Sequence, residues 1–145
     1  KSTQIHGGSM QIYVRRRPAR LENFLLNVKA NRKELWRYLR EEKRKGKSIA
    51  GFAASAKGIT LLAACGLTYR MIDYIVDGTP YKQGKFTPGT NIPILPDEEL
   101  MHRRPDIVLI LAWNFREEIL KKLKGRGYTF VIPVPKVEIL RDEDI

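Results

Sequence analysis

The alternation of hydrophobic and polar positions predicts strands that alternate with helices. Four short apolar runs are typical of buried strands, and they are Ser48–Ala53, Ile72–Asp77, Asp106–Leu111 and Tyr128–Pro133. Helical spacing follows the first run and ends at Gly66, and a second helix ends near Lys124. This order predicts an α/β fold in which a parallel sheet is covered by helices on both faces.

A strand and a long helix are predicted ahead of this alternation. Met10, Ile12 and Val14 alternate with polar or aromatic neighbours, so Gln4–Val14 is predicted as a strand entered through a glycine turn. Arg15–Arg20 is predicted as a basic linker. Helical spacing then runs to about Lys45 and stops at Gly46. Its apolar stripe is predicted to serve packing rather than ligand contact, and consists of Leu21, Phe24, Leu25, Val28, Leu35, Trp36 and Leu39.

The stretch from Lys47 to Gly66 is the first candidate binding segment. Small residues in its turn let a ligand approach the backbone, and unpaired N–H groups at the helix start favour an anion. About 20 residues after the turn begins, the next apolar run ends in Asp77. This is the outline of a nucleotide-binding βαβ unit. Gly51 and Gly58 frame the turn but Ala53 stands at its centre, so a plain tight crossover remains an alternative.

Three segments that are distant in sequence are expected to meet at the carboxyl edge of the sheet, where ligands of such folds bind. They are Ser55–Gly58, Asp77 with the long loop Gly78–Pro93, and Trp113–Asn114. The loop is expected to be ordered, and its Lys82 and Lys85 can reach an anion. Asn114 is also placed to cap the following helix, with Glu117 in the reciprocal position of a capping box.

The positive charge of the chain is concentrated near one helix. The net charge is +11, and residues 15–47 hold 13 basic residues against four acidic ones. Such a segment attracts phosphate polymers or an acidic protein surface, and it is also typical of a solvated helix face. No aromatic residues are interleaved on the basic face and no nucleic-acid motif is present, so nucleic-acid binding through this helix is the least favoured alternative.

Chain length and cysteine content bear on the number of domains, on metal binding and on the cellular compartment. The chain has 145 residues, enough for one domain with a core, and its single Cys65 lies on an apolar helix. Cys65 is predicted to be a buried core residue, and one cysteine with two histidines predicts no metal site. No apolar run approaches the roughly 20 residues that span a bilayer. The opening at Lys1 does not resemble a signal peptide, so a cytoplasmic fragment of a longer protein is expected.

Five segments occur, in this order, in one known family. They are His6–Ser9, Gly51–Gly58, Ile72–Asp77, Lys82–Thr90 and Pro105–Phe115. In these segments, and over roughly residues 5–135, the chain resembles the C-terminal domain of the S-adenosylmethionine-dependent nucleotide-sugar C-methyltransferases. The family usually has glycine where Ala53 stands and commonly asparagine where Ile59 stands. Ala53 narrows the approach to the backbone, and Ile59 removes a polar side chain from the helix start.

The resemblance implies a domain organisation. Enzymes of this family have an N-terminal zinc-binding domain, a central methyltransferase domain and a Rossmann-like C-terminal domain that closes over the sugar nucleotide. Residues 1–20 would then be a junction strand and linker from an upstream methyltransferase domain, and residues 21–145 the Rossmann-like C-terminal domain. S-adenosylmethionine would be bound mainly by the upstream domain, with no cofactor in this segment, which is expected to be inactive alone. Homo-oligomers are a further expected assembly.

The resemblance also implies a reaction, which is methyl transfer to a ring carbon beside a keto group. A base removes the proton alpha to the carbonyl, and the resulting carbanion attacks the methyl sulfonium. The main base is expected upstream, with His6 as a candidate proton relay. The predicted substrate-binding residues are Gly51, Ser55, Ala56, Lys57, Gly58, Asp77, Lys82, Lys85, Trp113 and Asn114. A stand-alone nucleotide- or dinucleotide-binding module remains the alternative function.

Overall fold

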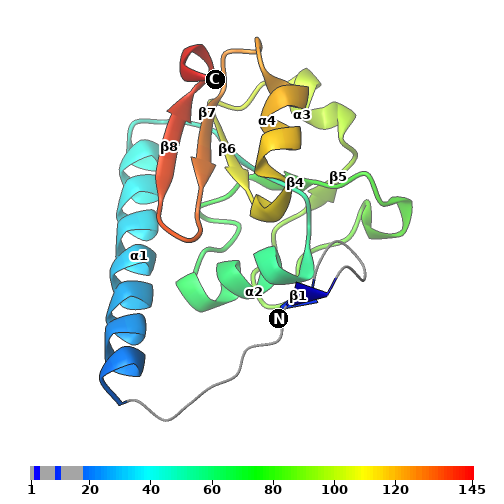
Figure 1. Ribbon diagram of the computed structural model, residues 1–145. Helices are drawn as coiled ribbons and strands as arrows, with labels where there is room; N and C mark the ends of the chain where they lie inside the picture. The colour runs from blue at the N-terminus through cyan, green and yellow to red at the C-terminus, as the bar shows by residue number, and fades with distance from the viewer. Residues whose placement is uncertain (1, 4–8, 11–17) are drawn as a thin grey trace.

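A six-stranded, mostly parallel sheet forms the centre of the protein (Figure 1). The computed structural model describes residues 2–3, 9–10 and 18–145. The strands are β3 (Ile49–Phe52), β4 (Tyr74–Val76), β5 (Ile94–Leu95), β6 (Ile107–Ile110), β7 (Thr129–Ile132) and β8 (Glu138–Arg141), in the spatial order β5-β4-β3-β6-β7-β8. All neighbours are parallel except β7 and β8. The α/β prediction is confirmed, with an antiparallel strand added at one edge.

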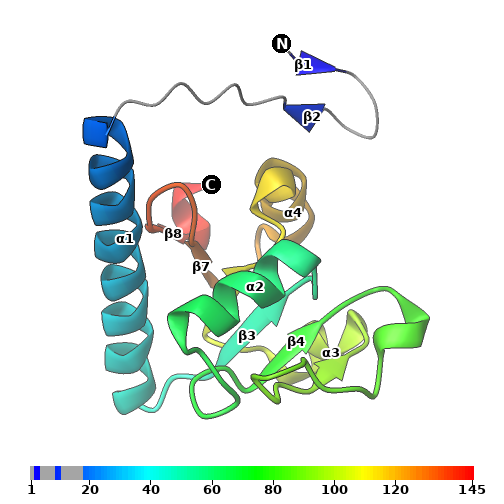
Figure 2. The same ribbon diagram turned by 90° about the horizontal axis from the view of Figure 1, so that it is seen from below.

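Helices cover both faces of this sheet, as predicted (Figure 2). They are α1 (Pro18–Arg44), α2 (Ala56–Cys65), α3 (Glu98–Arg103) and α4 (Arg116–Leu123). Helices α1 and α2 pack on one face, and α3 and α4 pack on the other. The structure also contains three single 3₁₀ turns, η1 (Pro80–Lys82), η2 (Trp113–Phe115) and η3 (Asp142–Asp144).

The first 20 residues depart in part from the expected strand and linker. A short pair of antiparallel strands, β1 (Ser2–Thr3) and β2 (Ser9–Met10), is present, and the rest of the predicted strand Gln4–Val14 lies outside the described residues. The linker prediction is wrong for its last three residues because α1 already begins at Pro18. Proline suits the first helical turn, where its missing N–H has no intrahelical partner to lose.

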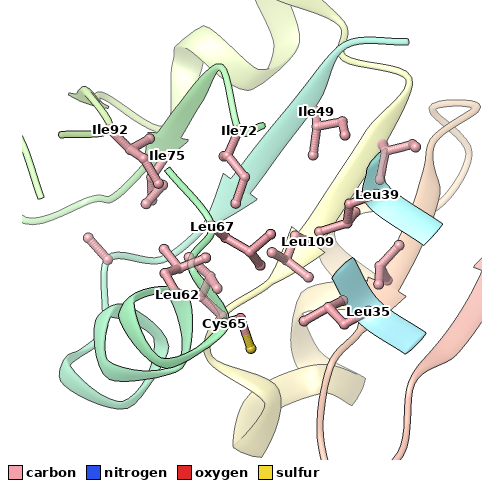
Figure 3. Packing of buried hydrophobic residues seen from close by; sticks show 14 of the residues in the cluster. Leu35, Leu39, Ile49, Leu62, Cys65, Leu67, Ile72, Ile75, Ile92 and Leu109 are labelled. Carbon is pink, nitrogen blue, oxygen red and sulfur yellow. The ribbon is translucent and has the colours of Figure 1, made fainter. Parts of the chain in front are cut away.

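The core between α1, α2 and the sheet is apolar and closely packed (Figure 3). Leu35 and Leu39 of α1 and Leu62 of α2 are fully buried against the strands. Cys65 is buried in the same cluster, which confirms its predicted role as a core residue. Burial raises the pKa of the Cys65 thiol, since the thiolate loses its hydration there.

Among the described side chains of helix α1, those that contact the domain lie in its second half. The Asn31 side chain donates to the Pro133 carbonyl (2.7 Å) and accepts from the Val137 amide (2.8 Å), which fixes the helix to the β7–β8 connection. Leu35 and Leu39 follow as the buried contacts. Within the described residues, the first half of the apolar stripe does not pack against the domain. Four large apolar side chains there are exposed, namely Phe24, Leu25, Leu26 and Val28.

Much of the positive charge at the end of α1 is paired or stacked. Lys43 forms an ion pair with Asp73, and Lys45 with Glu41 and Glu42. The Arg40 guanidinium lies over the Trp36 ring. No helix in the described ranges is long and apolar enough to cross a bilayer.

The order of the strands locates the ligand-binding edge of the sheet. From β3 the chain builds outward through β4 and β5, and it then returns to the other side of β3 to build β6, β7 and β8. The switch point therefore lies between β3 and β6. In open α/β sheets the crevice at the carboxyl ends of such strands is where ligands bind.

Candidate functional site

Ser55 fixes the start of α2 at the switch point. As the N-cap residue, its hydroxyl oxygen accepts from the Gly58 amide (3.0 Å), and its hydroxyl donates to the Leu111 carbonyl after β6 (2.9 Å). The turn after β3 is thus tied to the end of β6. Among the hydrogen bonds of the described residues, none uses the amides of Ala56 and Lys57 in the first turn of α2.

The two glycines that frame the turn serve packing. A Cβ atom on Gly58 would lie 2.6 Å from Leu111 Cβ and 3.0 Å from its carbonyl oxygen. One on Gly51 would lie 2.8 Å from Ile75 Cγ1. Gly58 is buried, and Leu111 occupies the space that a side chain at this position would need. The absence of a side chain therefore allows α2 to lie close to the end of β6. Ligand contact at Gly51 and Gly58 stays a prediction.

Ala53, at the centre of the turn, has a backbone conformation that glycine adopts more readily. Its φ angle is +70°, in the left-handed region that residues with a Cβ seldom adopt. The Ala53 amide donates to the Val76 carbonyl at 2.8 Å, so the turn is held in this conformation by the neighbouring strand.

Asp77 holds the turn from the end of β4. The residue is 6% exposed, and its carboxylate accepts from the Ala54 amide (2.7 Å), the Thr79 amide (2.9 Å) and Lys82 Nζ (3.0 Å). Burial opposes ionisation most strongly, but the bonds from Thr79, Lys82 and Ala54 together outweigh it, so the pKa of Asp77 is lowered. Three of about four acceptor positions are in use, which leaves one for a ligand.

Lys82 places a fixed cation beside this turn. Besides its ion pair with Asp77, its ammonium donates to the Ala54 carbonyl at 3.1 Å. The side chain is 26% exposed, and an ammonium has three N–H groups, so one remains for a ligand. The residue comes from η1 in the long loop, which links that loop directly to the β3–α2 turn.

A polar hollow of about 450 Å³ opens at the switch point. It lies at the ends of β3, β4 and β6, and its polar lining comes from Ser55, Asp77, Thr79, Lys82, Asp97, Glu118 and Lys122. Lys122 of α4 donates to Asp97 at 3.2 Å and lies over the Phe52 ring. The hollow therefore mixes cations with carboxylates, which suits a ligand rich in hydroxyl groups.

The structure brings some of the predicted site residues to this hollow and separates others. Ser55, Asp77 and Lys82 line it together. The side chains of Lys57 and Asn114 are exposed and do not line it, and Trp113 packs against the core between α4 and the sheet. His6 lies outside the described residues.

The capping prediction for Asn114 is wrong. Residues Trp113–Phe115 form the turn η2, and α4 begins only at Arg116, without a side-chain cap at its N-cap residue, Phe115. Asn114 lies inside η2 and so precedes the start of the helix. Its remaining role as a substrate contact stays a prediction.

A second hollow, also of about 450 Å³, is apolar. Ala56 and Lys85, both predicted site residues, line it together with Ile59, Tyr81 and Phe86. The two aromatic residues were missed by the sequence interpretation. The signal was present, because each aromatic residue is adjacent to a lysine, as Tyr81-Lys82 and Lys85-Phe86.

The loop that carries these residues is ordered, as predicted. The hydroxyls of Thr87 and Thr90, both buried, lie 2.6 Å apart, and Thr87 accepts from the Ile92 amide (2.9 Å). The Gln83 side chain donates to the Asp77 carbonyl at 2.9 Å. The loop therefore presents its side chains from a fixed backbone.

The chain matches the family described as the C-methyltransferase C-terminal domain over residues 16–135. The chain belongs to this family. As a C-methyltransferase C-terminal domain, it is also 42% identical over 101 residues to C-methyltransferase NovU of Streptomyces niveus, a match that covers 68% of this chain. The same match covers 24% of the relative, so the domain corresponds to about a quarter of that protein. Within the described part of this domain, no group of three His, Cys, Asp or Glu residues is placed to hold a metal ion.

Proposed function

We propose that this chain is the substrate-closing domain of a cytoplasmic, S-adenosylmethionine-dependent C-methyltransferase that acts on a nucleotide-linked keto-deoxysugar. The domain binds the phosphates and the sugar, while the methyl-donor site and the main base lie in an upstream domain. The observation that carries this proposal is the set of groups at the carboxyl edge of the sheet, called the rim from here on. Lys82 and the free amides of α2 stand there beside a hollow lined by hydroxyl-binding groups.

S-adenosylmethionine supplies the electrophilic methyl group when it is bound to the enzyme. The residues at the rim of this domain do not fit that cofactor. In nucleotide-binding folds, an acid at the end of the second strand accepts the two hydroxyls of a ribose. Asp77 holds that position, but three of its acceptor sites are used by Ala54, Thr79 and Lys82. The same fact disfavours the alternative of a dinucleotide-binding module.

The full-length enzyme with Lys82→Met tests the proposal. Loss of one charge-assisted hydrogen bond to a phosphate or sugar oxygen is expected to raise the KM for the keto-sugar nucleotide about 10- to 100-fold. The KM for S-adenosylmethionine should stay within twofold. Lys121→Met on α4 removes the same charge away from both hollows and serves as the control. A variant that loses kcat while both KM values are unchanged contradicts a positioning role for Lys82.

The exposed first half of α1 supports the upstream domain as its partner. Every side chain from Glu22 to Ala30 is exposed, and Phe24 is 60% exposed although it is large and apolar. Apolar side chains gathered on one helix mark an interaction surface. About three quarters of the related C-methyltransferase lies outside the match, so an upstream domain of the same chain is the proposed occupant.

Phe24→Gln with Val28→Gln should therefore loosen the domain contact in the full-length enzyme. We expect cleavage between the domains in limited proteolysis to accelerate about tenfold, with the melting temperature of the isolated C-terminal chain unchanged. Asn23→Gln with Asn27→Gln changes exposed residues of the same helix and should have no effect. A shift from dimer to monomer, without faster cleavage, would instead show that a second copy covers this face.

A further inference from the structure

The polar and the apolar hollow are neighbours that share the β3–α2 turn. Ala53 and Ser55 line the polar hollow, and the alternate residues Ala54 and Ala56 line the apolar one. Lys82 lines both. A ligand that extends past Lys82 can therefore enter both hollows at once.

The apolar hollow has the chemistry of a site for an aromatic ring next to an anion. Tyr81 and Phe86 are 70% and 65% exposed, so two large rings are presented on the ordered loop. Lys82 and Lys85 stand beside them, and Lys85 Nζ lies 5.8 Å from the centre of the Tyr81 ring. No carboxylate lines this hollow in the described part of the chain.

The polar hollow differs in the charge of its lining. Asp77, Asp97 and Glu118 line it along with Lys82 and Lys122. Carboxylates repel phosphate groups but accept hydrogen bonds from sugar hydroxyls. A phosphate is therefore best placed near Lys82 and the free amides at the start of α2, where the helix dipole also favours negative charge.

We propose that the apolar hollow binds the nucleobase of the substrate, with the diphosphate at Lys82 and the sugar in the polar hollow. This inference rests on the proposed function and adds the direction in which the nucleotide lies. The base packs against Tyr81 and Phe86, and stacking on aromatic side chains does not depend on which base is present. The nucleotide then crosses the turn at Ala54–Ala56, where small side chains leave room for it.

The test uses the full-length enzyme and compares two probes, thymidine diphosphate and inorganic pyrophosphate, by calorimetry. Tyr81→Ala and Phe86→Ala are each expected to weaken binding of thymidine diphosphate about tenfold, because a stacking partner is lost. Binding of pyrophosphate, which has no base, should change less than twofold. Tyr81→Phe keeps the ring and should bind both probes like the unmodified enzyme. Uridine diphosphate should follow thymidine diphosphate, since stacking tolerates either base.

Tyr69→Ala is the matched control, because Tyr69 is an exposed aromatic residue that lines neither hollow. Equal weakening of both probes, or no weakening of either, overturns the inference. It is also overturned if the unmodified enzyme binds pyrophosphate as tightly as the nucleoside diphosphates. Failure of the proposed function is a separate result, namely no methyl transfer to any keto-sugar nucleotide. If methylation proceeds with an unchanged KM in the two alanine variants, only the base site is refuted.

Discussion

Replacing Gly58 with alanine is expected to lower the free energy of unfolding of this domain by about 2 kcal/mol. The new Cβ would lie 2.6 Å from Leu111 Cβ and 3.0 Å from the Leu111 carbonyl oxygen. Neither atom can swing away as the end of a flexible side chain can, so α2 must move. Overpacking of this kind costs up to about 3 kcal/mol, and the better helix propensity of alanine returns about 1 kcal/mol.

The displacement of α2 also predicts a loss of binding. Ser55 caps α2 and bonds to the Leu111 carbonyl, so a shift of the helix away from Leu111 moves the turn between the hollows. Urea unfolding measures the stability, and the KM for the keto-sugar nucleotide in the full-length enzyme measures the second effect. Gly78→Ala is the control for the stability measurement, since its Cβ would meet nothing closer than Asp97 Oδ2 at 3.5 Å. Equal free energies of unfolding for the two variants would show that α2 does not pack closely against Leu111.

The order of elements could be predicted from the sequence because each of four buried strands is a short, continuous run of apolar residues. Four apolar runs and the helical spacing between them were enough to predict β3, β4, β6 and β7 and the helices on both faces of the sheet. The short edge strands β5 and β8 were not among these four runs. The position of Asp77 at the end of β4 follows from the same patterns. So does the burial of Cys65, because it lies on the apolar face of α2.

Features that depend on contacts between distant segments could not be predicted. The apolar stripe of α1 has one period along its whole length, but among its described side chains those that meet the domain lie from Asn31 onward. The point at which α1 leaves the surface of the domain depends on the length of the sheet and its connections, which the sequence of the helix does not contain. Likewise, Asn114 has a suitable sequence to cap a helix, yet the chain forms η2 there and starts α4 at Arg116. Capping residues signal a helix start only to within a turn.

In the candidate site, too, local features could be predicted from the sequence and contacts between distant segments could not. The lysines of the loop were predicted as anion contacts from their charge, but Lys82 acquires its position through Asp77 and the Ala54 carbonyl. Tyr81 and Phe86 were not predicted as site residues, and they line the apolar hollow together with Ala56 and Ile59 of α2. Which side chains share a hollow is a property of the folded chain, because the β3–α2 turn and the loop are about 25 residues apart.

Replacing Asp77 with alanine is expected to cost more than any other single change at the rim, about 3 kcal/mol of unfolding free energy. The variant leaves the Ala54 and Thr79 amides without their acceptor and Lys82 without its counter-ion. Breaking a buried ion pair costs about 3–5 kcal/mol, and the lower end applies because Lys82 is 26% exposed and can be hydrated. Asp97→Ala is the control. Its pair with Lys122 lies at the surface and should contribute less than about 1 kcal/mol.

Adding Lys82→Met to Asp77→Ala should restore about 1 kcal/mol, since the unpaired ammonium is then removed. Acid should also reduce the difference between the unmodified domain and Asp77→Ala. The pKa of Asp77 is lowered by folding, so its contribution is complete above its unfolded value of about 4 and is lost as the pH falls below that. If the double variant is no more stable than Asp77→Ala, the cost lies in the two amides. Asp77 would then act on the turn alone, and Lys82 would owe its position to the Ala54 carbonyl.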